Sequence, residues 1–279
     1  FTMWLSANLV ISTIALGVLA GPAAFYLGFW DSVAAIIIFN ALGVLAPAIL
    51  ATLGPRLGLR QMTISRFAFG WVGGIIMALF NVAACIGWSA VNVIVGAQLI
   101  KALACGSANQ CSVLGLSLSS TVVQALGILI IAVLTTVVSI YGYRYVHRYE
   151  RIAWIPMAII FAIVAIVGSV SSQHFQITAF PGWSVGEIAS LVSFGGAIFG
   201  FAIGWASYAA DYNVNQPENT RPARVFWLTS LGIFIPCVVL EILGVLLASL
   251  SNSGNVTGGG LLAQALGPLG AFGTILIFL

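Results

Sequence analysis

Residues 67–100 have the sequence FAFGWVGGIIMALFNVAACIGWSAVNVIVGAQLI, without a single aspartate, glutamate, lysine or arginine. A helix needs about 20 apolar residues to cross a hydrocarbon core about 30 Å thick, so this stretch is long enough to span a membrane. Hydrophobic residues make up 61% of the 279 residues and charged residues only 5%, whereas a soluble domain carries about 25% charged residues. The composition therefore predicts an integral membrane protein rather than an apolar soluble core.

The remaining charge-free stretches indicate which kind of membrane fold the chain forms. In lipid only helices and closed barrels satisfy every backbone polar group, and barrel strands alternate in polarity along their length. Ala34–Phe39 and Leu126–Leu134 are continuously apolar instead. We therefore predict an all-α, multi-span helical bundle that forms a single transmembrane domain over 1–279, with helices near 2–27, 32–53, 67–100, 120–142, 152–171, 188–210 and 225–249 and an eighth that begins near 267.

Positive charges predict how the bundle lies in the membrane. The connections 54–66, 143–151 and 211–224 hold all the lysines and arginines except Lys101. Because positive residues near helix ends stay in the cytosol, these connections and the N-terminus are predicted to be cytosolic. That topology excludes a seven-helix receptor with an external N-terminus.

Two features of the other connections agree with this topology. The glycosylation sequon Asn255-Val256-Thr257 falls in a connection predicted to lie outside. Cys105 and Cys111 share another outside connection, where an oxidising compartment permits a disulfide. The sequence leaves open whether that disulfide forms.

The third predicted helix carries Trp88 and Asn92 well inside the span. Residues four apart share one face of a helix. An aromatic ring can stack on a planar base for about 1–3 kcal/mol, and an amide can pair with the edge of a heterocycle, so the pair suggests a flat, hydrogen-bonding ligand. In the alternative, Trp88 packs between helices and Asn92 forms a helix–helix hydrogen bond.

The sixth predicted helix contains Gly195, Gly196, Gly200 and Gly204, followed by Trp205. Glycine weakens a helix, and interrupted helices in transporters occur where backbone groups line a binding site. Three of these glycines are spaced by four residues, so the stripe could also serve close helix packing. Both interpretations remain open at this stage.

The first predicted helix also shows signs of interruption. Ser6, Asn8, Ser12 and Thr13 are polar, and Gly21-Pro22 either breaks the helix or marks its outer end. The first and sixth helices lie five apart, as corresponding broken helices do in transporters built from two inverted five-helix repeats. No convincing residue-level repeat is visible.

Glu241 is the only acid predicted inside a span. A charge at the centre of a membrane helix costs about 2.5–3.5 kcal/mol on insertion scales. Glu241 is therefore either a proton relay or a residue toward the outer third that is protonated or reaches interfacial water. The sequence contains no cluster of metal-ligating side chains and no nucleophile–base pair, so we predict no metal and no enzymatic activity. The net charge of +3 follows from the topology and indicates no nucleic-acid binding.

Three stretches resemble the nucleobase:cation symporter family, in particular its fungal purine-cytosine permease branch. They are GPRLGLRQMTISRFAFG at 54–70, GWSAVNVIVG at 87–96 and GWASYAADY at 204–212. The resemblance extends over essentially the whole chain. It implies a twelve-helix transporter with a five-plus-five inverted-repeat fold in the plasma membrane, which imports purine bases and cytosine with a coupling proton.

The resemblance also implies a binding site. Trp88 and Trp205 would sandwich the nucleobase, Asn92 would hydrogen-bond its edge, Gly204 would offer backbone contacts and Ser12 a further contact. The preferred base, the proton-carrying residue and the oligomeric state stay open, as do a related heterocycle such as allantoin, uracil or thiamine and a non-transporting fragment as alternatives. The chain begins at Phe1 and stops within the predicted eighth helix, so we expect a partial domain that lacks the family's helix-eight asparagine and cation-site residues.

Overall fold

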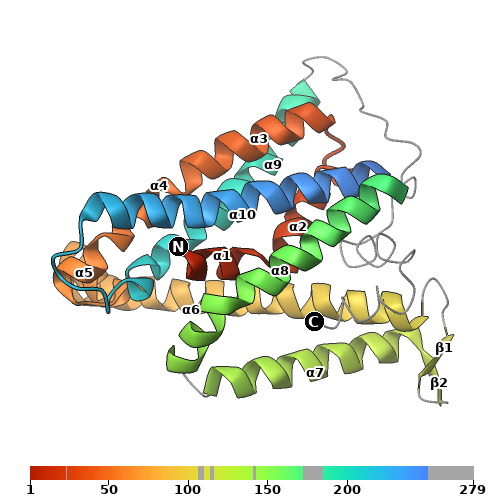
Figure 1. The fold of residues 1–279 in the computed structure, drawn as a ribbon, viewed down its shortest axis with the longest axis horizontal. Helices are drawn as coiled ribbons and strands as arrows, with labels where there is room; N and C mark the ends of the chain where they lie inside the picture. The colour runs from red at the N-terminus through yellow and green to blue at the C-terminus, as the bar shows by residue number, and fades with distance from the viewer. Residues whose placement is uncertain (23, 106–109, 114–115, 141–142, 172–184, 251–279) are drawn as a thin grey trace.

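The computed structural model of the protein describes residues 1–279 except 23, 106–109, 114–115, 141–142, 172–184 and 251–279 (Figure 1). The described residues form helices and one short hairpin. In chain order they are α1 (Thr2–Asn8), α2 (Ile11–Val18), α3 (Phe29–Gly43), α4 (Leu45–Ala51), α5 (Leu53–Leu57), α6 (Gln61–Cys105), β1 (Gln110–Val113), β2 (Leu116–Ser119), α7 (Ser120–Ile140), α8 (Tyr143–Ser171), α9 (Val185–Gly204), the 3₁₀ helices η1 (Trp205–Ser207) and η2 (Ala209–Tyr212), and α10 (Pro222–Leu250).

Six of these stretches are long and apolar enough to cross a membrane: Phe29–Leu57, Gln61–Cys105, Ser120–Ile140, Arg148–Val167, Val185–Tyr212 and Pro222–Ser249. The predicted all-α, multi-span architecture is therefore confirmed. The predicted eighth helix near 267 and the sequon at 255–257 lie outside the described residues.

The first predicted helix, 2–27, is wrong in its extent. It consists of α1 and α2, which are separated at Leu9 and Val10, and α2 ends at Val18. Gly21-Pro22 lies beyond that end, so this pair does not cause the interruption.

The second predicted helix consists of α3, α4 and α5, which together form one apolar stretch of spanning length. Pro47 and Pro55 lie just after its two interruptions, where each proline removes a backbone N–H from the helix ladder. Gly58 then ends α5 in the left-handed conformation, with φ of 62°, which glycine adopts without steric cost.

The third span begins at Gln61, six residues earlier than predicted. Gly70 interrupts it with φ of 68° and ψ of −176°, a backbone conformation that only glycine adopts readily, so a short helix precedes the long one. Arg66 belongs to that short helix, and its guanidinium lies 4.4 Å from the centre of the Trp71 ring. The prediction placed the helix start after Arg66 because it treated that charge as the end of a connection.

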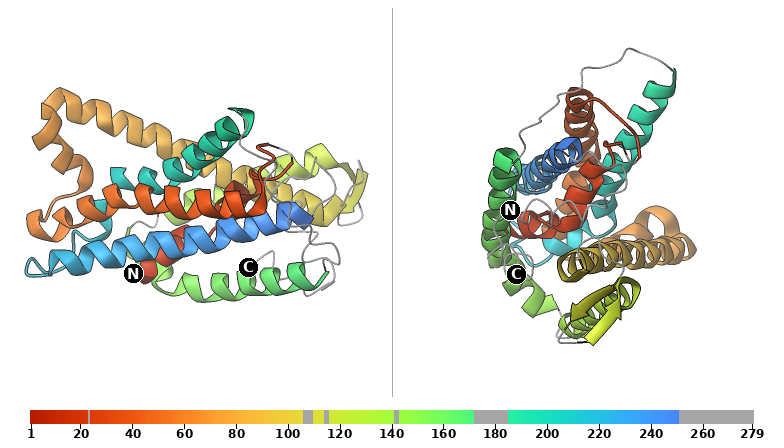
Figure 2. Two further views of the ribbon diagram at one scale, coloured as in Figure 1. Left: turned by 90° about the horizontal axis from the view of Figure 1, so that it is seen from above. Right: turned by 90° about the vertical axis from the view of Figure 1, so that its right-hand side faces the viewer.

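The core of the molecule lies where α10 packs against α2 and α3, with α8, α9 and α1 around them (Figures 1 and 2). Ile14, Leu240 and Val164 are fully buried in one cluster. Glycines let the backbones of α2 and α10 touch, since a Cβ added at Gly244 would lie 2.9 Å from the Cα of Gly17. This contact fixes the second half of the interrupted first span against α10.

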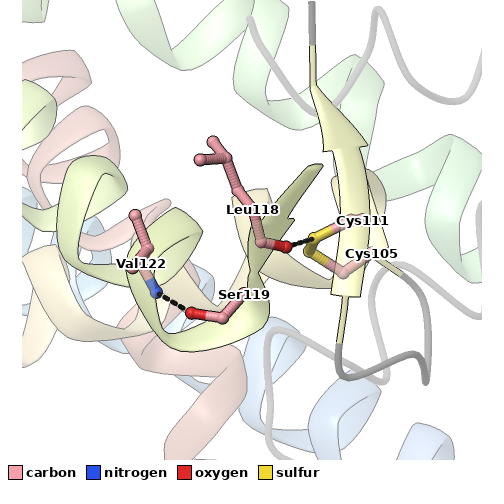
Figure 3. The surroundings of a disulfide bond; sticks show 5 residues. All are labelled: Cys105, Cys111, Leu118, Ser119 and Val122. Carbon is pink, nitrogen blue, oxygen red and sulfur yellow. Dashed lines mark hydrogen bonds between the residues drawn. A yellow bond between two sulfur atoms is a disulfide. The ribbon is translucent and has the colours of Figure 1, made fainter. Parts of the chain in front are cut away.

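The helices α6 and α7 form an antiparallel pair beside this bundle, and the right-hand view of Figure 2 shows the pair set apart from it. The polar connection predicted between the two helices contains the hairpin of β1 and β2, in which Cys111 pairs with Leu118. A disulfide joins Cys105 at the end of α6 to Cys111 (Figure 3). The backbone N–H of Val122 donates to Ser119 Oγ at 3.3 Å and leads the chain into α7.

The three connections predicted to share one side lie together at one end of the bundle. The backbone N–H of Gln61 donates to Asp211 Oδ1 at 2.8 Å. Tyr212 donates from its hydroxyl to Glu150 Oε1 at 3.2 Å, and Ser6 Oγ donates to the backbone carbonyl of Glu150. These bonds tie 54–66, 143–151 and 211–224 to one another and to α1.

Candidate functional site

The interruption between α1 and α2 is held open by side chains. Leu9 has φ of −82° and ψ of 68°, and Val10 is extended with φ of −132° and ψ of 157°. Asn8 Nδ2 donates to the carbonyl of Trp4 at 2.9 Å, and Thr13 Oγ1 donates to the carbonyl of Asn8 at 2.9 Å. Because side chains satisfy these backbone groups, the helix can break in this buried position without leaving them unpaired.

The second interruption lies at the end of α9. The α-helix stops at Gly204, and Ser207 Oγ donates to the carbonyl of Gly204 at 3.1 Å. Two short 3₁₀ turns follow, separated by Tyr208 with φ of −143° and ψ of 20°. The helix therefore runs through all four glycines and unwinds only after the last of them, Gly204. The packing alternative is not seen at Gly196 and Gly200, because a Cβ at either residue would have no neighbour within 4 Å.

The two interruptions meet at one hydrogen bond. Trp205 Nε1 donates to Asn8 Oδ1 at 2.9 Å, and Cys237 Sγ of α10 lies 3.4 Å from the same oxygen. The Trp205 ring stands edge-on to Trp4 with centroids 5.4 Å apart, and Tyr212 stacks on Trp4 at 4.3 Å. Three aromatic side chains, Trp4, Trp205 and Tyr212, therefore cluster where the α1–α2 break meets the end of α9.

Three of the five predicted site residues come together at this junction. Trp88 and Trp205 are both half-buried against one buried cluster formed by Trp4, Val44, Phe201, Ala202, Ile233 and Cys237. Trp88 meets Phe201 edge-on with ring centroids 5.0 Å apart. Gly204 faces the same indole, because a Cβ added there would lie 3.9 Å from Trp88 Nε1.

The other two predicted site residues make different contacts. Asn92 is exposed on α6, and its Nδ2 donates to the carbonyl of Trp88 in its own helix at 2.9 Å. The helix–helix hydrogen bond of the packing alternative is therefore not formed among the described residues. Ser12 is 1% exposed on α2, and its hydroxyl has no hydrogen-bond partner in the part of the chain that the structure describes.

Sequence reasoning missed the residues that join the two interruptions. Asn8 had a usable signal, since an amide inside a span must find a hydrogen-bond partner. Trp4 and Tyr212 had none, because aromatic residues near the ends of spans usually lie at the membrane interface. Their contacts depend on long-range folding, which brings positions 4, 205 and 212 together.

Six apolar stretches of spanning length, together with the aromatic junction where the α1–α2 break meets the end of α9, define a multi-pass integral membrane protein. No group of three metal-ligating side chains occurs in the part of the chain that the structure describes.

The sequence matches, over residues 1–279, the family described as permeases for cytosine/purines, uracil, thiamine and allantoin. The chain belongs to this family, and the curated relatives that it matches are named as permeases or transporters, not as enzymes. It is 40% identical to the purine-cytosine permease fcyB of Emericella nidulans over 98% of this chain and 52% of that protein. It is 39% identical to the purine-cytosine permease FCY2 of Saccharomyces cerevisiae over 87% of this chain and 43% of that protein.

The family also contains a relative with a different named substrate. The chain is 32% identical to the vitamin B6 transporter TPN1 of Saccharomyces cerevisiae over 90% of this chain and 41% of that protein. The chain thus spans about half the length of the curated relatives it matches. No solved structure matches it, so the five-plus-five inverted-repeat fold stays a prediction.

Proposed function

We propose that the full-length protein is a secondary active transporter that imports purine bases and cytosine together with a proton. The observation that carries this proposal is the junction of the two interrupted spans, where Trp88, Gly204 and Trp205 lie around one aromatic cluster. The 40% identity to a purine-cytosine permease over nearly the whole chain supports the choice of substrate class.

The contacts of the five proposed site residues suit a planar heterocycle. The indoles of Trp88 and Trp205 supply flat apolar faces for stacking. Gly204, at the end of α9, has no side chain, so a ligand can approach its backbone closely. Asn92 bonds only within its own helix among the described contacts, so its amide can turn to the edge of a base. Ser12 has a buried hydroxyl without a hydrogen-bond partner among the described residues, and a ligand would provide one.

The proposed orientation places the protein in the plasma membrane with its N-terminus in the cytosol. The three connections rich in lysine and arginine meet at one end of the bundle through the Gln61–Asp211 and Tyr212–Glu150 hydrogen bonds. Positive residues near helix ends favour the cytosolic side, so that end is the inner one.

Uptake by the full-length gene product tests the substrate and the site together. Cells lacking their own nucleobase carriers should accumulate radiolabelled cytosine and adenine when they express the protein. Asn92→Ala should raise the apparent KM by roughly 10- to 100-fold, because an unpaired edge of a buried base costs about 1–3 kcal/mol.

The matched control for this variant is Asn81→Ala, which removes an amide from the same helix nearer its cytosolic end. Uptake with Asn81→Ala should resemble that of the unmodified protein. No uptake by cells that carry the protein at their surface contradicts the proposed function, and normal uptake by the Asn92→Ala variant contradicts the site.

Proton coupling predicts that uptake falls as the external pH rises and stops when a protonophore collapses the gradient. Uptake that is indifferent to both treatments contradicts proton symport and leaves the substrate proposal standing.

A second candidate is transport of another small heterocycle, which the 32% identity to a vitamin B6 transporter favours. Competition separates the two. Unlabelled adenine and cytosine should block cytosine uptake, whereas uracil, thiamine, allantoin and pyridoxine should not. The reverse order of potency would identify the second candidate.

A further inference from the structure

Glu241 lies inside α10 with no exposed surface. Asn40 of α3, also fully buried, donates from Nδ2 to Glu241 Oε2 at 2.5 Å and to the carbonyl of Ile36 at 3.0 Å. Two oxygens of this pair, Glu241 Oε1 and Asn40 Oδ1, have no hydrogen-bond partner among the described residues. The carboxyl therefore does not reach interfacial water, whereas the other form of that alternative, a protonated acid toward the outer third, is not contradicted.

No positive charge among the described residues compensates Glu241. The helix facing it, α2, has no titratable side chain, and neither do α1 and α4. On α10 itself the buried Cys237 lies one turn before Glu241, and on α3 the only acid is Asp31 at the start of the helix. The charged residues of α8 and α9 near their ends, Arg148, Glu150, Arg151 and Glu187, form no described hydrogen bond or ion pair with Glu241.

A bare carboxylate in this position is unstable. Its charge costs about 2.5–3.5 kcal/mol at the centre of a membrane helix on insertion scales, and more where nothing pairs with it. One proton on Glu241 Oε1 removes the charge and turns that oxygen into a hydrogen-bond donor. The other unpartnered atom, Asn40 Oδ1, is a hydrogen-bond acceptor. A sodium ion fits less well, because hard cations take about six oxygen ligands and this site offers two free ones.

The acid is connected to the candidate substrate site. Cys237, one helical turn from Glu241, lies 3.4 Å from Asn8 Oδ1, the atom that accepts the hydrogen bond of Trp205. The backbone of Glu241 is also packed directly on α2, since a Cβ added at Gly17 would lie 2.9 Å from its Cα. Any shift of the interrupted first span against α10 therefore changes the surroundings of this carboxyl.

We propose that Glu241, positioned by Asn40, is the group that binds the coupling proton. This inference rests on the proposed function. The carboxylate takes up one proton from the outer side while the substrate site is open to that side. Glu241 stays a neutral acid while the protein passes through its closed state, and it then releases the proton to the cytosolic side. No other bond forms or breaks. The contact of α10 with α2 links this cycle to the substrate site.

Proteoliposomes that contain the full-length protein separate the proton step from substrate binding. In unmodified protein, an inward pH gradient should drive radiolabelled cytosine several-fold above equilibrium, and counterflow without a gradient should also occur. Glu241→Gln imitates the protonated acid and cannot release a proton, so accumulation should fall to equilibrium while counterflow persists. Glu218→Gln, which changes an exposed acid before α10, should behave like the unmodified protein.

Two results overturn the proposal. One is accumulation by the Glu241→Gln variant with an unchanged pH profile. The other is accumulation in the unmodified protein that a sodium gradient drives and a pH gradient does not. Unmodified protein that moves no heterocycle at all refutes the proposed function itself, and the assignment of Glu241 falls with it.

A second variant decides the outcome if the Glu241→Gln variant shows no counterflow. Glu241→Asp keeps an acid but moves it away from Asn40, so counterflow should return with a shifted pH midpoint for accumulation. An unshifted midpoint contradicts the proposal. If this variant is also inactive, a pH-sensitive dye in liposomes with unmodified protein should report about one proton per cytosine, and a ratio near zero overturns the assignment.

Discussion

The bundle around α10 and the pair of α6 and α7 differ in burial and in the hydrogen-bond partners of their polar side chains. In the most apolar stretch of α10, 61% of the residues are buried, against 6% in α6 and 11% in α7. Within the bundle, Asn8 and Asn40 each bond to a side chain of another element. On α6 and α7, Asn92 and Thr135 bond back to carbonyls of their own helices.

This difference distinguishes two kinds of polar group in a membrane protein. Groups in the bundle are committed to the fold, because removing one leaves a buried partner unsatisfied. Asn92 on α6 and Thr135 on α7 bond only within their own helices among the described contacts, so their side chains can bind something else, whether a ligand or a further segment. The proposed site lies between the two regions, with Trp88 from α6 and Trp205 from the bundle side.

The largest expected contrast comes from two tryptophans. Trp4 is 2% exposed and holds the junction, so Trp4→Ala should destabilise the protein by about 3–5 kcal/mol. Trp71 on α6 is 67% exposed, so Trp71→Ala should cost only about 0.5–1 kcal/mol through its contact with Arg66. Thermal unfolding of the detergent-solubilised protein, followed by size-exclusion chromatography, measures both. Equal losses would show that α6 is as tightly packed as the bundle in the full-length protein.

The same substitution at two glycines gives an intermediate contrast. Gly17→Ala places a methyl group against the backbone of Glu241 and should cost about 1–3 kcal/mol through overpacking. Gly87→Ala on α6 meets nothing within 4 Å and should be neutral or stabilise the helix by up to about 1 kcal/mol. The midpoint of thermal unfolding should move in opposite directions. A loss with Gly87→Ala would place another segment against that face.

The smallest expected effect compares two asparagines. Asn8→Ala removes the acceptor of Trp205 Nε1 and should lower stability by about 1 kcal/mol. Asn92→Ala removes only a bond within its own helix and should leave the unfolding midpoint unchanged while it impairs uptake. A matching drop in stability for both variants would place Asn92 among the groups that hold the fold.

The fold class was predictable because lipid leaves few options. A chain with 5% charged residues and long apolar stretches must satisfy its backbone inside helices, and the charge pattern located most of their ends. The interruption at Leu9 and Val10 was not predictable from helix-breaking residues, since neither is glycine or proline. It depends on Asn8 and Thr13, whose side chains replace the lost backbone bonds.

The candidate site was predictable in part for a related reason. Trp88, Gly204 and Trp205 stand out locally, as aromatic and flexible residues within apolar spans. Trp4, Tyr212 and the Asn40–Glu241 pair acquire their roles only through contacts across the bundle. No local pattern encodes those contacts, because each needs two segments that the sequence separates widely.

The disulfide between Cys105 and Cys111 offers a way to measure in which direction the protein was inserted into the membrane. Cytosolic reductants keep thiols reduced, whereas the secretory lumen and cell exterior let them oxidise. In the proposed orientation, a correctly inserted molecule would therefore carry the Cys105–Cys111 disulfide at the end of α6, and an inverted molecule would carry two thiols that can be alkylated. After alkylation of free thiols, mass spectrometry can therefore measure what fraction of the molecules was inserted in each direction.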